Sequence, residues 1–519
     1  MMLHPRSHAQ ATPDAPAIIM GATGDVTTYG ELERRANQTA QLFRSAGLRI
    51  GDAIAIVMEN NARYLEVTWA AQRAGLRYTA VNSHLTANEV QYILDDCGAK
   101  AIIASAFLAD VVAGLDTSRI RARYAVGGEL PGFASYEDSS AAMPTTPIVD
   151  EREGTEMLYS SGTTGRPKGV QKPLPDTGLG DPAARGVQMA QGWLDRYGMR
   201  PGDVYLCPAP LYHAAPLVAC MCTHRIGGAV VVMERFDAEQ CLRLIEKYRV
   251  THAQFVPTMF VRLLALDESV RQAYDVSSLR FAVHAAAPCP IAVKEQMIQW
   301  WGPILNEYYS GTEDIGGTSL TSQEWLEHKG SVGRGRDGAV IHIVGPDGGE
   351  LPAGEAGAIY FSGHAATFEY HNDPDKTASI SDERGWRTLG DIGYVDAEGY
   401  LYLTDRKAYM IVSGGVNIYP QEAENVLGGH PAVLDVAVIG VPNSEYGEEV
   451  KAVVQLTEGA VASDAMAAEL IAFCKSQLAT YKCPRSVDFV EALPRDPNGK
   501  LYKRRLRDQY WQGHDSHVV

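Results

Sequence analysis

Residues 159–170 gather the residue types that bind a polyphosphate. The segment holds three glycines, four serine or threonine hydroxyls and two cations. Backbone N–H groups, hydroxyls and positive charge could therefore surround phosphate oxygens. It is not a Walker loop, because Pro167 stands five positions after Gly162 and no serine or threonine follows Lys168 in that register. The sequence predicts a phosphate-binding loop of another kind.

Seven further motifs follow this loop in a fixed order. With the loop, they resemble the adenylate-forming family of acyl-CoA synthetases, peptide-synthetase adenylation domains and beetle luciferases. The motifs are Pro-Leu-Tyr-His at 210–213, Ala-Ala-Ala-Pro at 285–288, Tyr-Ser-Gly-Thr-Glu at 309–313, Gly-Ser-Val-Gly-Arg at 330–334, and the segments 385–391, 403–406 and 493–500.

The resemblance implies ATP-dependent adenylation of a carboxylic acid, followed by transfer of the acyl group to coenzyme A. A carboxylate that attacks the α-phosphate brings two anions together, so the site must neutralise charge. The resemblance assigns Glu313 to Mg²⁺, a hard cation that prefers oxygen ligands. It assigns Lys500 to the carboxylate and α-phosphate, and Thr163 to the catalytic set. His213 is implied as an aromatic gate between the ATP and acyl pockets, with a plain core histidine as the alternative.

The nucleotide contacts are also implied by the resemblance. Tyr309 stacks on adenine, and Asp391 accepts hydrogen bonds from the ribose hydroxyls with Arg406 as its basic partner. A surface salt bridge between Asp391 and Arg406 is the alternative. The other residues assigned to nucleotide or coenzyme A binding are Ser161, Gly162, Thr163, Thr164, Gly165, Lys168, Ala286, Ala287, Pro288, Glu307, Tyr308, Thr312, Ser413, Gly414 and Gly415.

A few residues should select the acid. Residues 212–216 hold no carboxylate to pair with the ammonium of an amino acid. The expected acyl contacts are His213, His284, Ser310 and Gly311, although His284 would serve equally well as a strand-end cap. Ser310 is much smaller than the tryptophan of acetate-activating members, so we expect a pocket that is not restricted to acetate. Residues 284–289 and 306–309 resemble those of ligases for medium- or long-chain fatty acids or bulky ring-bearing acids of the steroid type. An aromatic acid, benzoate- or hydroxycinnamate-like, is the alternative.

A layered α/β body is needed to position these residues. Capping boxes at Thr28-x-x-Glu31 and Thr86-x-x-Glu89 open helices that alternate with apolar strand-like runs at 53–58, 78–81 and 101–104. The alternation resumes at 204–248 and predicts a mainly parallel sheet covered by helices. From about 330, short strands with Gly, Pro and Asp turns predict a β-rich subdomain.

The chain beyond residue 404 has an alternation of its own, with strands at 433–441 and 450–456 and a helix at 465–478. We therefore predict a large N-terminal α/β domain, 1–404, made of several subdomains. A small mobile α+β domain, 405–519, should follow a hinge at Asp405 and carry Lys500.

Composition limits the other functional classes. Lysine and arginine total 46 against 63 acidic residues, giving a net charge of −17, which disfavours nucleic acid as a partner. No signal-like N-terminus or 18-residue apolar run occurs, so we expect a soluble cytoplasmic enzyme without a membrane span, and a homodimer stays open. Cys220-x-Cys222-x-His224 resembles a metal cluster, but its apolar neighbours favour a buried structural role.

Two rival functions fit the same motifs. A sensor or scaffold would bind ATP without turnover, although the presence of Glu313, Asp391 and Lys500 argues against it. A light-emitting oxygenase would use the same adenylating fold and consume oxygen without coenzyme A.

Overall fold

The computed structural model describes residues 2–160, 167–364, 368–406, 409–413, 416–443, 446–495 and 501–512, with only the backbone of Ser160, Asp405, Arg406 and Asn417. The chain divides into two compact units. The first contains Met1–Phe255, Leu266–Ala282 and Ala366–Ser379, and the second contains Val256–Ala265, Val283–Ala365 and Ile380–Val519. The predicted α/β class, with large bodies of sheet and a smaller C-terminal domain, is confirmed. The hinge at Asp405 and the mobility of the C-terminal domain stay predictions.

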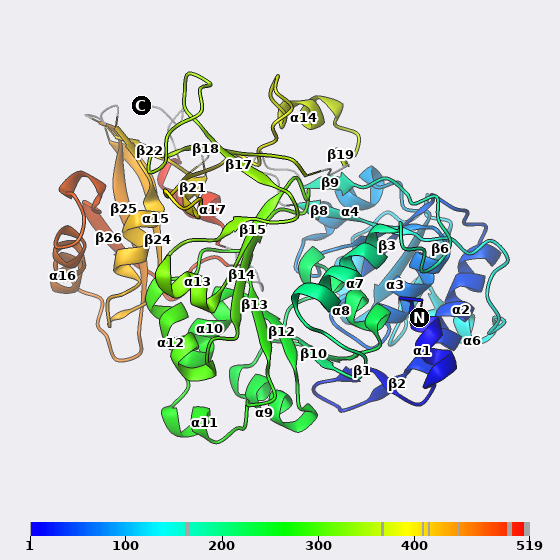
Figure 1. The fold of residues 1–519 in the computed structure, drawn as a ribbon. Coiled ribbons are helices and arrows are strands. Elements are labelled where there is room, and N and C mark those ends of the chain that lie inside the picture. The colour runs from blue at the N-terminus through cyan, green and yellow to red at the C-terminus, as the bar shows by residue number, and fades with distance from the viewer. Residues whose placement is uncertain are drawn as a thin grey trace. The chain divides into compact units, whose positions relative to one another are not determined.

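The first unit carries the N-terminal sheets and their helices (Figure 1). Its elements are α1 (Pro5–Ala11), β1 (Pro16–Met20), β2 (Val26–Thr28), α2 (Tyr29–Ser45), β3 (Ala53–Val57), α3 (Tyr64–Arg73), β4 (Arg77–Ala80), α4 (Ala87–Asp96), β5 (Ala101–Ser105), η1 (Ala106–Leu108), α5 (Ala109–Ala113), β6 (Ala122–Val126), β7 (Ala134–Ser135), α6 (Tyr136–Ala141), β8 (Thr155–Ser160), β9 (Lys168–Gln171), α7 (Arg185–Arg196), β10 (Val204–Cys207), α8 (Ala214–Ile226), β11 (Ala229–Val232), α9 (Ala238–Tyr248), β12 (His252–Phe255), α11 (Glu268–Gln272), β19 (Glu369–Tyr370) and α14 (Pro374–Ser379).

The second unit carries antiparallel sheets, and strand β13 (Phe281–His284) contains the boundary between the units. Its elements are α10 (Pro257–Leu264), α12 (Ile291–Trp301), β14 (Leu305–Ser310), β15 (Gly317–Thr321), α13 (Ser322–Glu327), β16 (Arg334–Gly335), β17 (Val340–Val344), β18 (Gly357–Ser362), β20 (Asp391–Val395), β21 (Leu401–Arg406), β22 (Ile411–Ser413), β23 (Val416–Ile418), α15 (Pro420–Leu427), β24 (Val433–Asn443), β25 (Gly447–Leu456), α16 (Asp464–Lys475), η2 (Thr480–Lys482), β26 (Ser486–Phe489) and α17 (Lys503–Tyr510).

The alternation of strands and capped helices in the first unit is confirmed. Both predicted capping boxes are present, at the starts of α2 and α4. Strands β3, β4, β5, β6 and β8 pair in parallel, and every residue of β3 and β5 is buried. The helices that connect parallel strands cover both faces of the sheet, so the strands are buried on both faces. This burial explains their uninterrupted apolar sequences.

Helices α3 and α8 lie in a central apolar layer. All of α3 is buried, and the core around these helices includes Ile54 of one sheet and Val230 of the other. The Cys220–His224 segment of α8 belongs to this layer. His224 accepts a hydrogen bond from Trp69 Nε1 at 3.0 Å, and its Nε2 lies 2.9 Å from the Ala17 carbonyl. The predicted structural role of this segment is confirmed, because both ring nitrogens bond to protein groups.

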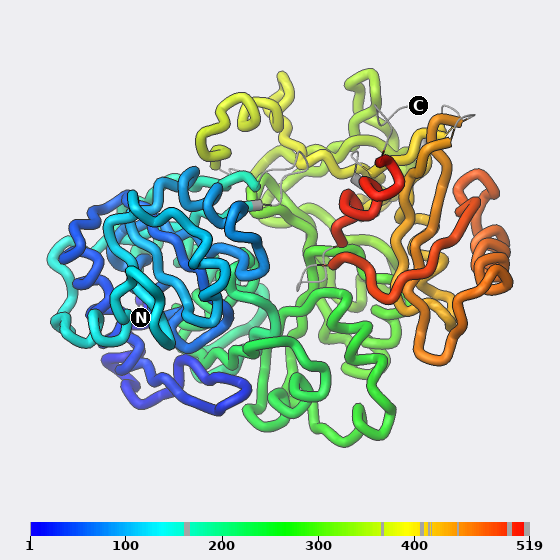
Figure 2. Tube along the Cα trace, turned by 180° about the vertical axis from the view of Figure 1, so that it is seen from behind, coloured from blue at the N-terminus to red at the C-terminus, as the bar shows by residue number. Residues whose placement is uncertain are grey.

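The second unit contains the predicted β-rich subdomain as the antiparallel sheet β17-β18-β20-β21. The C-terminal sheet, β23-β22-β25-β24 with β26 beside β25, has apolar side chains on both faces. Val436 and Val438 of β24 join one core, whereas Ala437 and Ile439 join another with Leu506 of α17. Figure 2 shows α17, in red, against one face of this sheet. No helix in the described ranges combines the length and apolarity that a membrane span requires.

Candidate active site

The predicted phosphate loop connects two antiparallel strands. Ser160 of β8 pairs with Lys168 of β9. Lys168 Nζ lies 3.2 Å from Asp373 Oδ2 and 5.7 Å from the centroid of the Tyr370 ring. The Lys168 ammonium therefore lies at the start of β9. Five residues assigned to this loop fall outside the described part of the chain and stay predictions: Ser161, Gly162, Thr163, Thr164 and Gly165.

The residues predicted for adenine and ribose meet in the second unit. Tyr309, on β14, donates a hydrogen bond from Oη to Asp391 Oδ2 of β20 at 2.5 Å. Asp391 is only 6% exposed. Asp391 also stands opposite Arg406 in the β20–β21 ladder, although the Arg406 side chain is not described. The structure therefore brings together two residues that are 82 positions apart in sequence.

The loop after β13 has a strained backbone. Ala286 adopts φ +74°, a conformation that side chains with a Cβ rarely take. Ala286 and Pro288 are exposed, and Ala287 is half-buried. Strain of this kind clusters at ligand sites, where the surroundings enforce it. The assignments of Ala286, Ala287 and Pro288 to the nucleotide stay predictions.

The turn between β14 and β15 is built around Glu313. Ser310 pairs with Gly317, and Gly311, Thr312 and Glu313 lie in the turn between them. The Glu313 side chain is buried. A Cβ at Gly311 would contact Leu389 Cδ1 and stand 2.8 Å from Glu313 Oε2, so a larger residue would shift both side chains. The Glu313 carboxylate oxygens are the donor type that Mg²⁺ prefers.

Ser310 and Tyr308 have partners within the second unit. Ser310 Oγ donates a hydrogen bond to the Gly316 carbonyl at 3.0 Å, which ties it to the Glu313 turn. The Tyr308 ring centroid lies 5.0 Å from the Arg336 guanidinium carbon. Because side chains alternate along a strand, Tyr308 points away from the face that carries Tyr309. The assignments of Ser310 to the acid and Tyr308 to the nucleotide stay predictions.

Glu307 lies in a buried charge cluster. Its Oε2 lies 2.6 Å from Lys294 Nζ of α12 and 3.5 Å from His284 Nε2. Burial raises the pKa of Glu307, and the Lys294 charge opposes that shift. Burial and Lys294 together hold the pKa of His284 well below its usual range. Glu307, predicted to contact the nucleotide, is thus paired with a lysine in the interior.

His284 has an unusual environment within this cluster. It is fully buried, and neither ring nitrogen has a hydrogen-bond partner within the described ranges. Its imidazole therefore does not cap a strand end in this structure. It packs edge-on against Phe260 of α10, with ring centroids 5.5 Å apart.

Lys294 was not identified from the sequence, although a signal for it exists. It shares the buried face of α12 with Met297, Ile298 and Trp301, at positions three, four and seven residues later. A lysine at this spacing on an otherwise apolar face indicates a buried charge that needs a partner. The partner, Glu307, is on a different element and could not be chosen by spacing alone.

His213 stands at the N-cap of α8. Its ring centroid lies 4.4 Å from that of Tyr212, which in turn lies 6.3 Å from His84. The three rings of His84, Tyr212 and His213 thus lie close together at the start of a buried helix. The role of His213 as a gate between the ATP and acyl pockets stays a prediction.

Two described pairings flank the C-terminal assignments. Ser413 pairs with Val416 between strands β22 and β23. A bridge between Arg495 and Leu501 closes the segment that contains Lys500. Gly414, Gly415 and Lys500 lie outside the described residues, as does the Asp405 side chain, and their roles stay predictions.

Known proteins resemble the chain over almost its full length. The AMP-binding enzyme model matches residues 5–371, and the AMP-binding enzyme C-terminal domain model matches residues 422–500. The long-chain-fatty-acid–CoA ligase FadD13 of Mycobacterium tuberculosis is 32% identical over 516 residues, 97% of each chain. A feruloyl-CoA synthase of Amycolatopsis sp is 34% identical over 509 residues, 98% of each chain. The crystal structure of ATP-bound MatB from Rhodopseudomonas palustris has a TM-score of 0.83 at 28% identity and covers 99% of each chain.

Proposed function

The chain belongs to the AMP-binding enzyme family, and on that premise we propose that it is an acid–CoA ligase. A carboxylate oxygen of the acid attacks the α-phosphorus of ATP and forms the O–P bond of an acyl adenylate. Pyrophosphate leaves with the electron pair of the broken P–O bond. The thiolate of coenzyme A then attacks the acyl carbon and forms a C–S bond, and AMP leaves with the electron pair of the broken acyl C–O bond.

The Tyr309–Asp391 hydrogen bond is the observation that carries this proposal. It holds an aromatic ring beside a buried carboxylate, as recognition of adenine and ribose requires. Glu313, on the turn after the same strand, would hold Mg²⁺, which when bound neutralises phosphate charge. Lys168 and Lys500 are the cations that we assign to phosphate and to the reacting carboxylate.

The acid that we favour is a medium- or long-chain fatty acid or a bulky ring-bearing acid. Ser310 leaves more room than a large aromatic residue would, and the similarity to a long-chain-fatty-acid–CoA ligase supports this class. An aromatic acid is the second candidate, supported by the 34% identity to a feruloyl-CoA synthase. One methylene changes selectivity by only about 1–3 kcal/mol, so a few pocket residues decide between the two.

Release of pyrophosphate and AMP, with and without coenzyme A, tests the proposal. The acids are acetate, octanoate, palmitate, benzoate, ferulate and a steroid side-chain acid. AMP formation that depends on coenzyme A and on one class of acid is the expected result. ATP binding without turnover across the panel would favour the sensor instead, and oxygen uptake without coenzyme A would favour the oxygenase.

A further inference from the structure

A cavity of about 290 Å³ lies within the first unit, beside helices α7 and α8, strand β8 and the segment that follows β9. All of its lining residues are described, and they do not include any residue that we assign to the nucleotide, the acid or coenzyme A. Ligand pockets in proteins have volumes of about 300–1,000 Å³. The cavity is therefore at the lower end of that range and can hold a small molecule.

One part of the cavity lining is apolar. It comes from α7 and α8, which pack side by side (Figure 1). Met189 of α7 and Leu217, Val218 and Met221 of α8 belong to it. Methionine side chains are flexible and fill irregular space, so they adapt to ligands of different shape. This part of the lining suits a hydrocarbon chain or a ring.

Another part of the lining is positively charged. Glu156 of β8 lies between two cations, with its Oε1 2.7 Å from Arg185 Nη1 and 3.5 Å from Lys172 Nζ. Burial alone would raise the pKa of Glu156, but the charges of Arg185 and Lys172 outweigh it and lower the pKa, so the carboxylate is ionised. Helix α7 begins here without a side-chain cap at Ala184, and the positive end of its dipole adds to the two cations.

The remaining charges of the lining leave this balance unchanged. Arg225 Nη2 lies 2.8 Å from Glu153 Oε2, and both side chains are at most 2% exposed, so they form an internal neutral pair. Asp176 is 93% exposed and pairs with Arg152, which is not part of the lining. The lining therefore contains three cations and two enclosed carboxylates. A monoanion balances this difference of one charge, whereas a phosphate monoester brings about two negative charges.

We propose that this cavity binds a small monocarboxylic acid with an apolar body, at a site separate from the reaction site. The carboxylate accepts hydrogen bonds from Lys172 and Arg185, beside Glu156, and the apolar body packs against Met189 and Val218. The inference does not depend on the proposed function. A ligand of this class is also the proposed substrate, so the experiment must distinguish the two sites.

Methyl NMR of protein labelled with [¹³C-methyl]methionine observes the cavity directly. Met189 and Met221 report on it, and the variants Met189→Leu and Met221→Leu assign their signals. Met297, buried on α12 of the second unit, is the reference. Octanoate should shift the two cavity signals until they saturate and leave Met297 unchanged. Uncharged 1-octanol should need a concentration about tenfold higher or more, the scale of one charge-assisted hydrogen bond, and inorganic phosphate should shift neither signal.

Two arginines of the same helix provide a matched pair of variants. Arg185→Met should weaken octanoate binding about tenfold, measured as the Kd from the Met189 signal. Arg196→Met changes an exposed arginine at the other end of α7 and should leave this Kd unchanged. If Arg185→Met does not fold, Val218→Trp fills the cavity without removing a charge and should abolish the octanoate-dependent shift.

Several results would overturn the proposal. They are the absence of octanoate-dependent shifts at Met189 and Met221 in the wild-type protein, equal binding of octanoate and 1-octanol, and an equal loss in the Arg196→Met control. Pyrophosphate exchange with the best acid of the panel should persist in Arg185→Met and Val218→Trp, and a loss parallel to that of binding would place the cavity in the reaction site. A wild-type protein that forms no adenylate contradicts the proposed function instead, while the Met189 signal still tests the cavity.

Discussion

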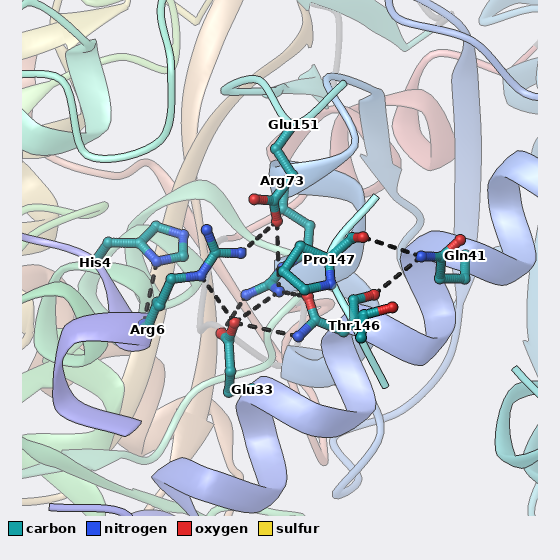
Figure 3. Close-up of polar contacts among 9 residues, drawn as sticks. His4, Arg6, Glu33, Gln41, Arg73, Thr146, Pro147 and Glu151 are labelled. Carbon is teal, nitrogen blue, oxygen red and sulfur yellow. Dashed lines mark hydrogen bonds and ion pairs between the residues drawn. The ribbon is translucent and has the colours of Figure 1, made fainter. Parts of the chain in front are cut away.

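Two charge clusters, one in each unit, differ in how many segments of the chain their ion pairs join. In the first unit, Arg6 and Arg73 share Glu33 and Glu151 (Figure 3). Asn37 accepts a further hydrogen bond from Arg73, whose Nε has no partner within the described ranges. The second unit has Lys294 paired with Glu307, beside an imidazole, His284, that makes no hydrogen bond within the described ranges.

The first cluster joins parts of the chain that are far apart in sequence. It connects α1, α2, α3 and the segment before β8, and Gln41 fixes that segment by donating to the carbonyls of Thr146 and Pro147 (Figure 3). The cluster around Glu307 lies two residues from Tyr309 on the same face of β14. The first cluster therefore ties four segments of the fold together, whereas the second lies next to the predicted nucleotide site.

Arg73→Met should give the largest change in stability. Arg73 is 1% exposed, and its removal leaves the partly buried carboxylates of Glu33 and Glu151 with Arg6 alone, which costs about 3 kcal/mol. Urea unfolding measures this loss. Arg249→Met is the matched control, because its pair with Asp275 is exposed and should contribute less than about 1 kcal/mol. Similar losses in the two variants would contradict the structural role of the first cluster.

Lys500→Ala should lower activity without a comparable loss of stability. Removal of one preorganised electrostatic donor lowers a rate by about 10²–10³-fold, and we expect this loss in adenylation. Pyrophosphate exchange measures it. Conversion of preformed acyl adenylate with coenzyme A should largely survive, and equal loss in both half-reactions would show that Lys500 has another role.

The stability of the first unit should fall in acid because His224 must stay neutral. Burial lowers its pKa from 6.5 to about 4, and its Nδ1 accepts from Trp69. Below pH 6.5 the unfolded chain binds a proton that the folded chain does not, so this stability is complete above pH 6.5. This stability is lost as the pH falls toward 4. Because one pKa unit corresponds to about 1.4 kcal/mol, the total loss is about 3 kcal/mol.

Urea midpoints measured between pH 7 and pH 4 test this expectation. The free energy of unfolding should fall by about a few kcal/mol over this range. His224→Asn keeps an acceptor for Trp69 but cannot titrate, so its stability should depend less on pH. His84→Asn changes an exposed histidine and should retain the original slope. An unchanged slope in His224→Asn would exclude His224 as the source.

The sequence predicted local structure well because the signals were local. The capping boxes placed α2 and α4, and continuous apolar runs placed β3 and β5. The helix expected at 465–478 ends at Lys475, and Leu478 packs against the core from beyond the helix end. Apolar periodicity alone does not reveal where a helix stops.

Long-range pairings were predicted only where the family resemblance supplied both partners. Tyr309 and Asp391 were expected in one site, and they form a hydrogen bond. The pairings of Lys294 with Glu307 and of Arg507 with Glu448 depend on which elements pack together. Nothing in the local sequence specifies that packing.

His284→Leu should have the smallest effect on stability and the most informative effect on selectivity. A buried imidazole without hydrogen bonds carries a desolvation penalty, so an apolar side chain should leave the free energy of unfolding unchanged or raise it by about 1 kcal/mol. His252→Leu is the control, because the ring nitrogens of His252 lie 2.9 Å from Thr251 Oγ1 and from the Tyr197 carbonyl, and its loss should destabilise. If His284 lines the acyl pocket, the order of kcat/KM across the acid panel changes in His284→Leu and not in His252→Leu. An unchanged order would leave His284 a packing residue, and the contrast between the two charge clusters would then rest on Glu307 and Lys294 alone.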